Sequence, residues 1–114
     1  MREPIRDSER LQHILDACNL LIQRQSQDSI QKLKDDPIKF YGYVKLIEII
    51  GEATYKITKE FREAHAEIPW NVMESMRHVL VHDYYRRSPE KLWNTVFYDI
   101  PTLKPLIEKI IETK

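Results

Sequence analysis

The segment spanning residues 74–87, ESMRHVLVHDYYRR, holds the side chains of this chain that are best suited to chemistry, and is called the site segment below. His82 is an imidazole that can give and accept a proton near neutral pH. Arg77 carries a planar guanidinium that can bind a phosphate through two hydrogen bonds, and Tyr84 adds a hydroxyl close by. Together these three groups suit the transesterification of an RNA phosphodiester through its 2′-hydroxyl.

Two other interpretations of the site segment are open at this point. His78 and His82 stand four residues apart, a spacing with which two histidines on one helix can bind a metal ion, with Asp83 or Glu74 helping. The pattern lacks a clear third ligand, so it indicates a metal site only weakly. The segment is also compatible with the plain solvated face of an amphipathic helix.

Helical geometry predicts how these side chains are arranged if the site segment is one straight helix. Arg77 and His82, five residues apart, then point about 140° away from each other, at the two edges of the polar face. Because they do not meet within one chain, a second copy of the helix across a two-fold axis would complete the site. Apolar residues at helical spacing predict the buried face of this helix: Val72, Met73, Met76, Val79 and Leu80.

The elements that must position the site segment are all predicted to be helices. The spacing of apolar residues predicts a first helix from about residue 8 to 25, then a polar connector over 26–36 with one short helical turn. A long helix over 37–64 follows, capped by Asp36. Gly51 lies inside this long helix, where glycine costs about 1 kcal/mol relative to alanine. We therefore expect another backbone to pass close to Gly51.

A turn over residues 65–68 and a break over 86–88 divide the rest of the chain into two more helices. The first of them, opened by Pro69, carries the site segment. The second must bend or restart at Pro101. No strand pattern is present, so the sequence predicts one domain over residues 1–114, an all-α up-and-down bundle of four to five helices with a long central helix.

Composition limits the classes of function. Eighteen basic residues balance eighteen acidic ones, so an anionic partner must be recognised locally rather than by overall charge. The two glycines are too few for a glycine-rich phosphate-binding loop. Cys18, the single cysteine, is predicted to be a buried core thiol. The charged N-terminal sequence MREPIRDSER and the lack of an apolar run of about 20 residues predict a cytoplasmic protein with no membrane segment.

The stretch from Leu46 to Trp93, LIEIIGEATYKITKEFREAHAEIPWNVMESMRHVLVHDYYRRSPEKLW, resembles the HepT-like family of the HEPN superfamily, the toxin half of prokaryotic HEPN/MNT toxin–antitoxin pairs. The first helix and the C-terminal DIPTLKPLIEKII fit the family more loosely. The family signature is an arginine, four residues, a histidine, one residue and a tyrosine. Arg77, His82 and Tyr84 match it.

The resemblance implies that this chain is the toxin, an endoribonuclease that cuts RNA without a metal ion or other cofactor. Arg77 and His82 from both chains of a homodimer would line the cleft where RNA is cut. The resemblance also implies a partner, an MNT-type nucleotidyltransferase antitoxin, which would neutralise the toxin by transferring AMP to Tyr84. Tyr85 is an adjacent competitor for this modification.

Four further residues are candidates for supporting roles in such a site. The position after the arginine is often asparagine in the family and is His78 here, which leaves its role open. Glu52 resembles a family position that would line the same cleft. Asp83 lies inside the signature, and Arg86 is close enough in sequence to steer a phosphate. The alternative function is a non-catalytic helical module that binds the nucleotidyltransferase or a nucleotide without cutting RNA.

Overall fold

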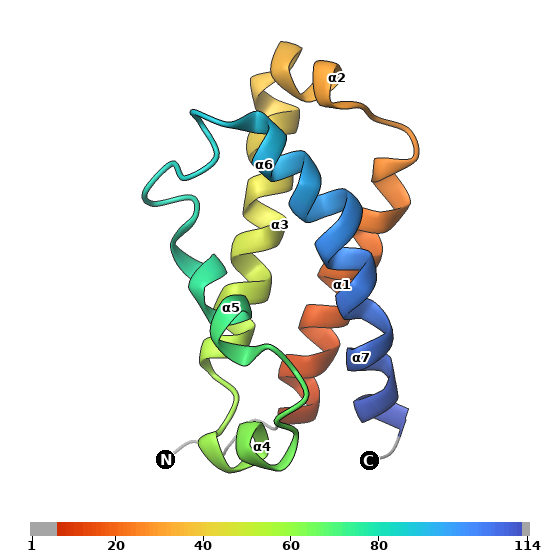
Figure 1. Ribbon diagram of the computed structural model, residues 1–114, viewed down its shortest axis with the longest axis vertical. Helices are drawn as coiled ribbons and strands as arrows, with labels where there is room; N and C mark the ends of the chain where they lie inside the picture. The colour runs from red at the N-terminus through yellow and green to blue at the C-terminus, as the bar shows by residue number, and fades with distance from the viewer. Residues whose placement is uncertain (1–6, 113–114) are drawn as a thin grey trace.

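Two long helices form the framework of the protein, whose computed structural model describes residues 7–112. Helix α1 (Asp7–Gln25) packs against α3 (Pro37–Tyr55), and α7 (Ile100–Glu112) packs along the other side of α1 (Figure 1). The described residues form helices and turns with no β-strand, which confirms the predicted all-α class. No helix in this part of the chain has both the length and the apolarity needed to span a membrane.

Apolar side chains from these helices form one buried core. Cys18 belongs to it, as predicted, and burial raises the pKa of its thiol to about 12. The largest side chains that are almost completely shielded come from every major helix: Leu11, Ile14, Leu21, Leu33, Val44, Ile47, Ile50, Met73, Leu92, Val96, Ile100 and Ile107. Burial of this apolar surface is the main force that holds the helices together.

The predicted connector contains a short helix, α2 (Ile30–Asp35), capped by the hydroxyl of Ser29. Before it, the carboxylate of Asp28 accepts hydrogen bonds from Lys39 and from the hydroxyl of Tyr43, both on α3. Asp36 then caps α3 by accepting from the amides of residues 38 and 39, and Pro37 occupies the first turn, as predicted. These polar contacts fix the path of the chain between α1 and α3.

The long central helix is shorter than predicted, because it ends at Tyr55 rather than near residue 64. Thr58 is the cause, since its hydroxyl caps a separate helix, α4 (Lys59–Ala64), by accepting from the amide of Phe61. The amide and hydroxyl of Thr58 also donate to the carboxylate of Asp7, at 3.0 and 2.7 Å. A cap that is itself held by α1 thus stabilises the turn at residues 56–58.

Arg62 on α4 fixes the corner that leads to the site segment. Its Nη2 donates to the main-chain oxygen of Thr54 at 2.6 Å, and its Nη1 lies 2.7 Å from the carboxylate of Glu74. The indole of Trp70 donates to the main-chain oxygens of Arg62 and His65. The turn over 65–68 is confirmed, and these contacts hold α4 against both neighbouring helices.

The last helix is continuous but changes its winding before Pro101. Helix α6 (Pro89–Asn94) passes into a π-helical turn, η2 (Thr95–Asp99), in which the amide of Ile100 donates to the main-chain oxygen of Thr95. The next oxygen in this pattern, on Val96, would need the amide of Pro101, and proline has none. Gln25 fills the vacancy with its side-chain amide, 3.1 Å from the Val96 oxygen. The predicted disturbance at Pro101 is therefore a widened turn.

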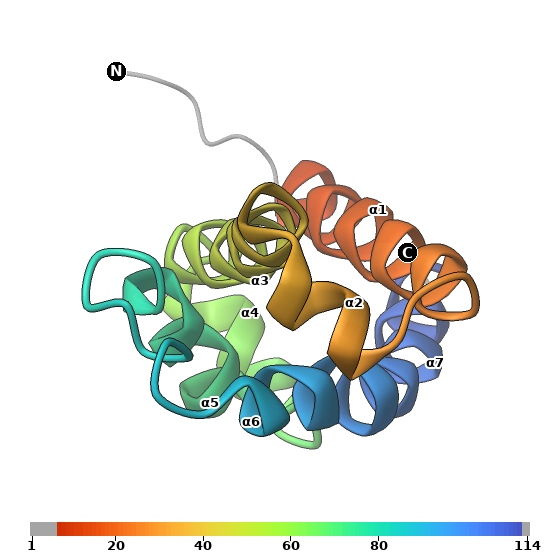
Figure 2. The ribbon, with the colours of Figure 1, turned by 90° about the horizontal axis from the view of Figure 1, so that it is seen from above.

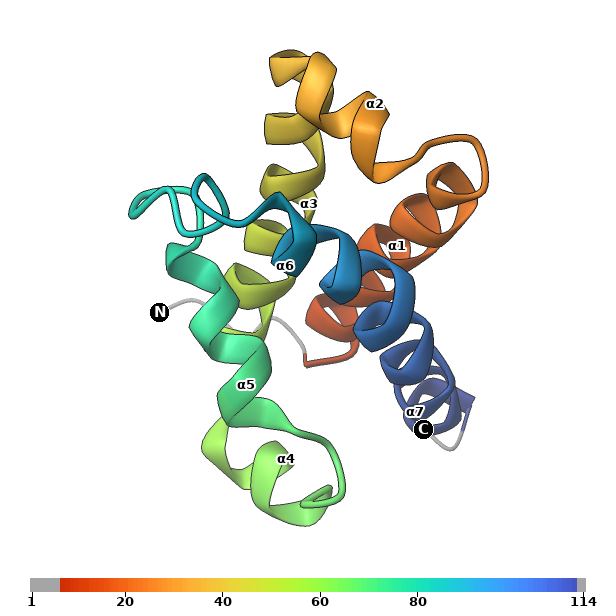
Figure 3. The same ribbon diagram turned by 45° about the horizontal axis from the view of Figure 1, so that its top comes forward.

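The site segment begins within helix α5 (Trp70–Ser75) and projects from the side of α3. Figures 2 and 3 show it in teal as an open loop at the edge of the bundle, between α5 and α6. Pro69 is the cap before α5 rather than its first residue. The predicted third helix therefore covers only the start of the site segment, and the path of the remaining residues depends on contacts with neighbouring helices.

Candidate functional site

The site segment leaves the α-helix before its chemical residues begin. Helix α5 ends at Ser75, a single 3₁₀ turn, η1 (Met76–His78), follows, and successive turns continue to residue 87. The predicted straight helix is thus wrong here, and so is the 140° angle derived from it. Val72, predicted to be buried, is 61 % exposed. Residue 83 adopts a left-handed conformation with φ of 50°, which turns the chain sharply between His82 and Tyr84.

Arg77 is held against α3. Its guanidinium carbon lies 3.6 Å from the centre of the Tyr55 ring, in a cation–π contact. Its Nε lies 3.9 Å from a carboxylate oxygen of Glu52, an ion pair too long for a hydrogen bond. The Nε atom is buried and has no hydrogen-bond partner within residues 7–112. Arg77 is therefore positioned by stacking and charge while keeping hydrogen-bonding capacity unused.

Gly51 explains how Arg77 comes so close to α3. A Cβ atom on Gly51 would lie 2.1 Å from the main-chain nitrogen of Arg77 and 2.5 Å from the carbonyl carbon of Met76. Only glycine allows the two backbones to approach this closely. The expectation that another backbone passes Gly51 is confirmed, and that backbone is the one that carries Arg77.

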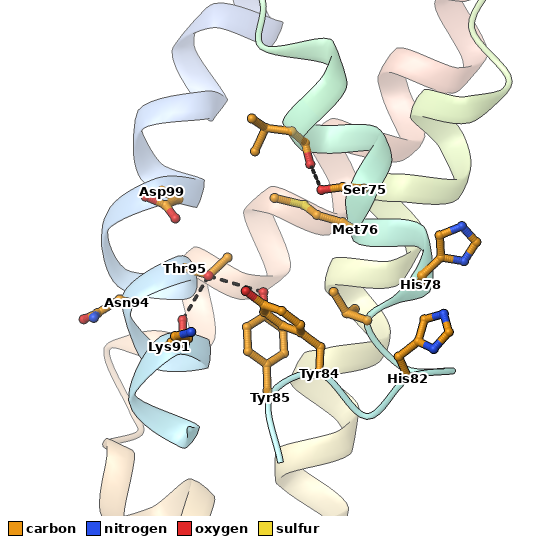
Figure 4. A pocket seen from close by; sticks show the side chains of 12 residues that line it. Ser75, Met76, His78, His82, Tyr84, Tyr85, Lys91, Asn94, Thr95 and Asp99 are labelled. Atoms are coloured by element: carbon orange, nitrogen blue, oxygen red, sulfur yellow. Dashed lines mark hydrogen bonds between the residues drawn. The ribbon is translucent and has the colours of Figure 1, made fainter. Parts of the chain in front are cut away.

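His78, His82 and Tyr84 line one pocket with a volume of about 470 Å³ between η1 and the α6–η2 helix (Figure 4). The two imidazole rings lie 5.8 Å apart between centroids. Arg77 is not among the residues that line this pocket. One chain thus brings His82 and Tyr84 together but turns Arg77 toward α3.

The two tyrosines have opposite environments. Tyr84 is 55 % exposed, whereas Tyr85 is buried at 4 % exposure. The Tyr85 hydroxyl lies 3.3 Å from the hydroxyl of Thr95. Burial raises the pKa of Tyr85 despite this hydrogen bond, and the nearby Tyr84 and Asp99 add to the effect. Only Tyr84 of this pair therefore presents its phenol to solvent.

The left-handed turn at Asp83 is held by α3 and by a neighbouring cation. The hydroxyl of Tyr41 donates to the Asp83 carboxylate at 3.0 Å, and this hydrogen bond raises the pKa of Tyr41. Arg86 forms a longer ion pair with the same carboxylate, at 3.8 Å. Asp83 thus shapes the turn that carries His82 and Tyr84, and Arg86 is an exposed cation beside it.

Several residues of the site were not foreseen from the sequence. Tyr55 follows Gly51 by four residues and so lies on the same face of α3, a signal that was present once Gly51 was interpreted as a contact point. Tyr41 had no such signal. Nor did the residues contributed by α6 and η2, because their place depends on how the helices pack: Lys91, Asn94, Thr95 and Asp99.

Metal ligands can be assessed from the same geometry. No group of three or more histidine, cysteine, aspartate or glutamate side chains in the described range is placed so that it could hold a metal ion. His78 and His82 form a pair without the third ligand that a protein metal site of this kind needs.

Comparison with known proteins identifies the family. The model of the family described as "Ribonuclease HepT-like" matches residues 14–110, and the chain belongs to this HepT-like family. A protein of Caldanaerobacter subterraneus named as a "Putative RNase" is 36% identical over 102 residues, covering 90% of this chain and 91% of that protein. A protein of Thermococcus cleftensis named "Probable ribonuclease HepT" is 35% identical, covering 88% and 91% of the two chains. No solved structure matches.

Proposed function

We propose that this protein is an endoribonuclease that cleaves RNA without a metal ion, and that it acts as the toxin of a toxin–antitoxin pair. The observation that carries the proposal is that His82 and Tyr84 line one pocket, while Arg77, in the same loop, is fixed against α3 by Tyr55 and Glu52. Membership of the HepT-like family and the names of the relatives support the same activity.

In the proposed reaction His82 takes the proton from a ribose 2′-hydroxyl, and the freed oxygen attacks the adjacent phosphorus. The bond from phosphorus to the 5′-oxygen of the next nucleotide breaks, that oxygen takes up a proton from water, and His82 returns its proton to the solvent. The products are a 2′,3′-cyclic phosphate and a 5′-hydroxyl. Arg77 stabilises the negative charge that develops on the phosphate oxygens through its guanidinium, a fixed cation suited to phosphate.

The reaction is proposed to take place in a homodimer, with Arg77 of one chain acting on the phosphate next to His82 of its partner. Within one chain Arg77 faces α3, while His82 lines a pocket that does not include Arg77. A two-fold axis that sets two site segments face to face would bring the two groups together. The exposed edge position of the loop is compatible with such an arrangement (Figure 3).

Neutralisation is proposed to be covalent. A nucleotidyltransferase antitoxin would bring ATP to Tyr84, whose phenol oxygen attacks the α-phosphorus, forms a tyrosyl–AMP bond and releases pyrophosphate. The exposure of Tyr84 and the burial of Tyr85 favour this assignment. The attached AMP would add a bulky anion beside His82 and exclude RNA by volume and by charge.

Measurement of RNA cleavage by the purified protein in the presence of a chelator tests this function. Replacement of His82 with alanine should lower the rate about 100-fold or more, the contribution expected of a general base. His13→Ala is the matched control, because His13 is exposed on α1 away from the pocket. Full activity of the His82→Ala protein would refute the catalytic assignment. Loss of wild-type activity on chelation would refute metal independence.

A further inference from the structure

The pocket beside His82 is large enough to hold a small organic ligand. Its volume of about 470 Å³ falls in the range of about 300–1,000 Å³ that is typical of small-molecule sites. Val72, Met76 and Val79 supply apolar lining on one side, and the α6–η2 helix forms the opposite wall (Figure 4). An apolar lining with a few polar groups is the usual composition of a site for an organic ligand.

The helical wall carries opposite charges at its two ends. Lys91, Thr95 and Asp99 follow one another at four-residue spacing, which places them along one side of the helix. Eight residues, about two helical turns, separate Lys91 from Asp99. Thr95 lies between them, with its hydroxyl bonded to the main-chain oxygen of Lys91 and close to the Tyr85 hydroxyl. The pocket is therefore cationic at one end and anionic at the other.

An aromatic ring stands beside the cationic end. The Lys91 Nζ atom lies 5.8 Å from the centre of the Tyr84 ring. In Figure 4 this ring lies between Lys91 on one side and His82 on the other. An exposed aromatic side chain is the platform on which proteins stack unpaired RNA bases.

We propose that this pocket binds one nucleotide unit of the RNA, next to the phosphate that is cut, and that it selects a base with an exocyclic amino group over uracil. Lys91 holds the phosphate of that unit, Tyr84 stacks on its base or sugar, and Asp99 accepts a hydrogen bond from the amino group. The proposal rests on the ribonuclease function proposed above and adds a determinant of substrate choice to it.

The discrimination follows from the chemistry of Asp99. An ionised carboxylate can only accept hydrogen bonds, so it pairs with the exocyclic amino group of cytosine, adenine or guanine. Uracil presents a carbonyl oxygen where cytosine has its amino group, and two acceptors repel each other. Asp99 has no hydrogen bond or ion pair of its own in the part of the chain described here, and its side chain is exposed on the pocket wall. It is thus available to a ligand.

Cytidine and uridine 5′-monophosphates are the matched probes, because cytosine carries its amino group where uracil carries a carbonyl oxygen. Their binding is measured by NMR titration of the full-length protein, with the pocket residues assigned. CMP should perturb the resonances of Lys91, Tyr84 and Asp99 and bind at least about tenfold more tightly than UMP. Equal binding of the two nucleotides, or no perturbation of these residues, would overturn the proposal.

Asp99→Asn supplies the decisive variant. Asparagine keeps the size of the side chain but adds an amide donor, so the preference for CMP over UMP should fall about tenfold or reverse. The matched control is Asp16→Asn, on α1 and outside the pocket, which should keep the wild-type ratio. An unchanged ratio in Asp99→Asn would overturn the role of Asp99.

Binding to RNA separates this inference from the function on which it rests. In the His82→Ala protein, short RNA strands that differ only in one cytidine or uridine should compete with CMP for the pocket. The strand with cytidine should compete more strongly than the strand with uridine. If no RNA strand displaces bound CMP, the proposal that the pocket binds a nucleotide unit of RNA is overturned. If the wild-type protein cleaves no RNA while CMP and cytidine-containing RNA still bind selectively, the ribonuclease function fails and the subsite stands. If the wild-type protein cleaves RNA without any preference between cytidine and uridine, the ribonuclease function stands and the subsite fails.

Discussion

Arg77 and Tyr84 lie in the same short loop but are controlled by different neighbours. The ring of Tyr55 and the charge of Glu52 set the direction of the Arg77 guanidinium. Tyr84, by contrast, keeps half of its surface open while the adjacent Tyr85 is tied to Thr95. The sequence predicts both residues as site candidates, but neither the stacking partner nor the exposure of each tyrosine could be read from it. Both properties depend on which helix the loop packs against.

The difference between the two tyrosines makes a prediction about modification. If the cognate nucleotidyltransferase transfers AMP to this protein, the Tyr84→Phe variant should gain no mass after co-expression. The Tyr85→Phe variant should gain as much mass as the wild type, because the buried Tyr85 hydroxyl is inaccessible. Intact-mass spectrometry makes the comparison. A mass gain on Tyr84→Phe that is lost on Tyr85→Phe would reverse the assignment.

At the scale of helices, the contact between α3 and η1 decides where Arg77 stands. The Gly51→Ala variant gains about 1 kcal/mol of helix propensity, but its new methyl group must displace the backbone at Met76 and Arg77. Backbone cannot yield as the end of a side chain can, and overpacking of this kind costs about 1–3 kcal/mol. We expect a net loss of stability in denaturant unfolding, together with loss of RNA cleavage.

Gly42→Ala is the matched control on the same helix. Nothing lies within 4 Å of the position that its Cβ would occupy. Replacement there should stabilise the protein by about 0.5–1 kcal/mol, because alanine is less free than glycine in the unfolded chain. If both variants were equally stabilised, the close approach at Gly51 would be refuted.

Much of the helical pattern was predictable, since apolar spacing, the cap at Asp36 and the first-turn Pro37 are local signals. The predicted lengths of the central helix and of the helix that carries the site segment were both wrong, for a common reason. Thr58 divides the predicted central helix because Asp7, distant in sequence, holds its hydroxyl and amide. Helix α5 stops at Ser75 although neither glycine nor proline occurs between residues 70 and 87. Contacts with α3 hold the following residues in another path, at Gly51 beside Met76 and through Tyr41 at Asp83, and no local pattern reports them.

For the molecule as a whole, Asp28 links stability to pH. Its burial acts to raise the pKa, but the hydrogen bonds from Lys39 and Tyr43 outweigh this effect and lower the pKa below its ordinary 3.8. The carboxylate therefore contributes stability that is complete above the unfolded pKa and is lost as pH falls through the lower folded pKa. The wild type should lose this contribution as the pH falls below about 4.

The Asp28→Asn variant should be less stable at neutral pH and should lose less stability across that acidic range. Urea unfolding at several pH values provides the measurement. Asp35→Asn, which removes an exposed carboxylate on α2, should retain the wild-type slope. A parallel pH dependence of the Asp28→Asn and wild-type proteins would show that the contact with Lys39 and Tyr43 carries no linkage.

The last prediction concerns the proposed homodimer. If each site takes Arg77 from one chain and His82 from the other, a heterodimer of Arg77→Ala and His82→Ala chains retains one complete site of two. Co-expression with two different tags allows this heterodimer to be purified, and it should show about half of the wild-type activity. Both parent homodimers should be inactive. An inactive heterodimer would mean that the two residues act within the same chain.

The bare backbone at Gly51 also limits how α3 and the loop can move relative to each other. Along α3 the other glycine, Gly42, lies nine residues away, or about 13.5 Å at 1.5 Å per residue. If the loop moved along α3 toward Gly42, the Arg77 backbone would meet a side chain at each position between the two glycines. The contact at Gly51 thus allows a single register of the loop against α3. The Arg77 backbone must then move together with α3. The two should show the same protection of their amides in hydrogen exchange.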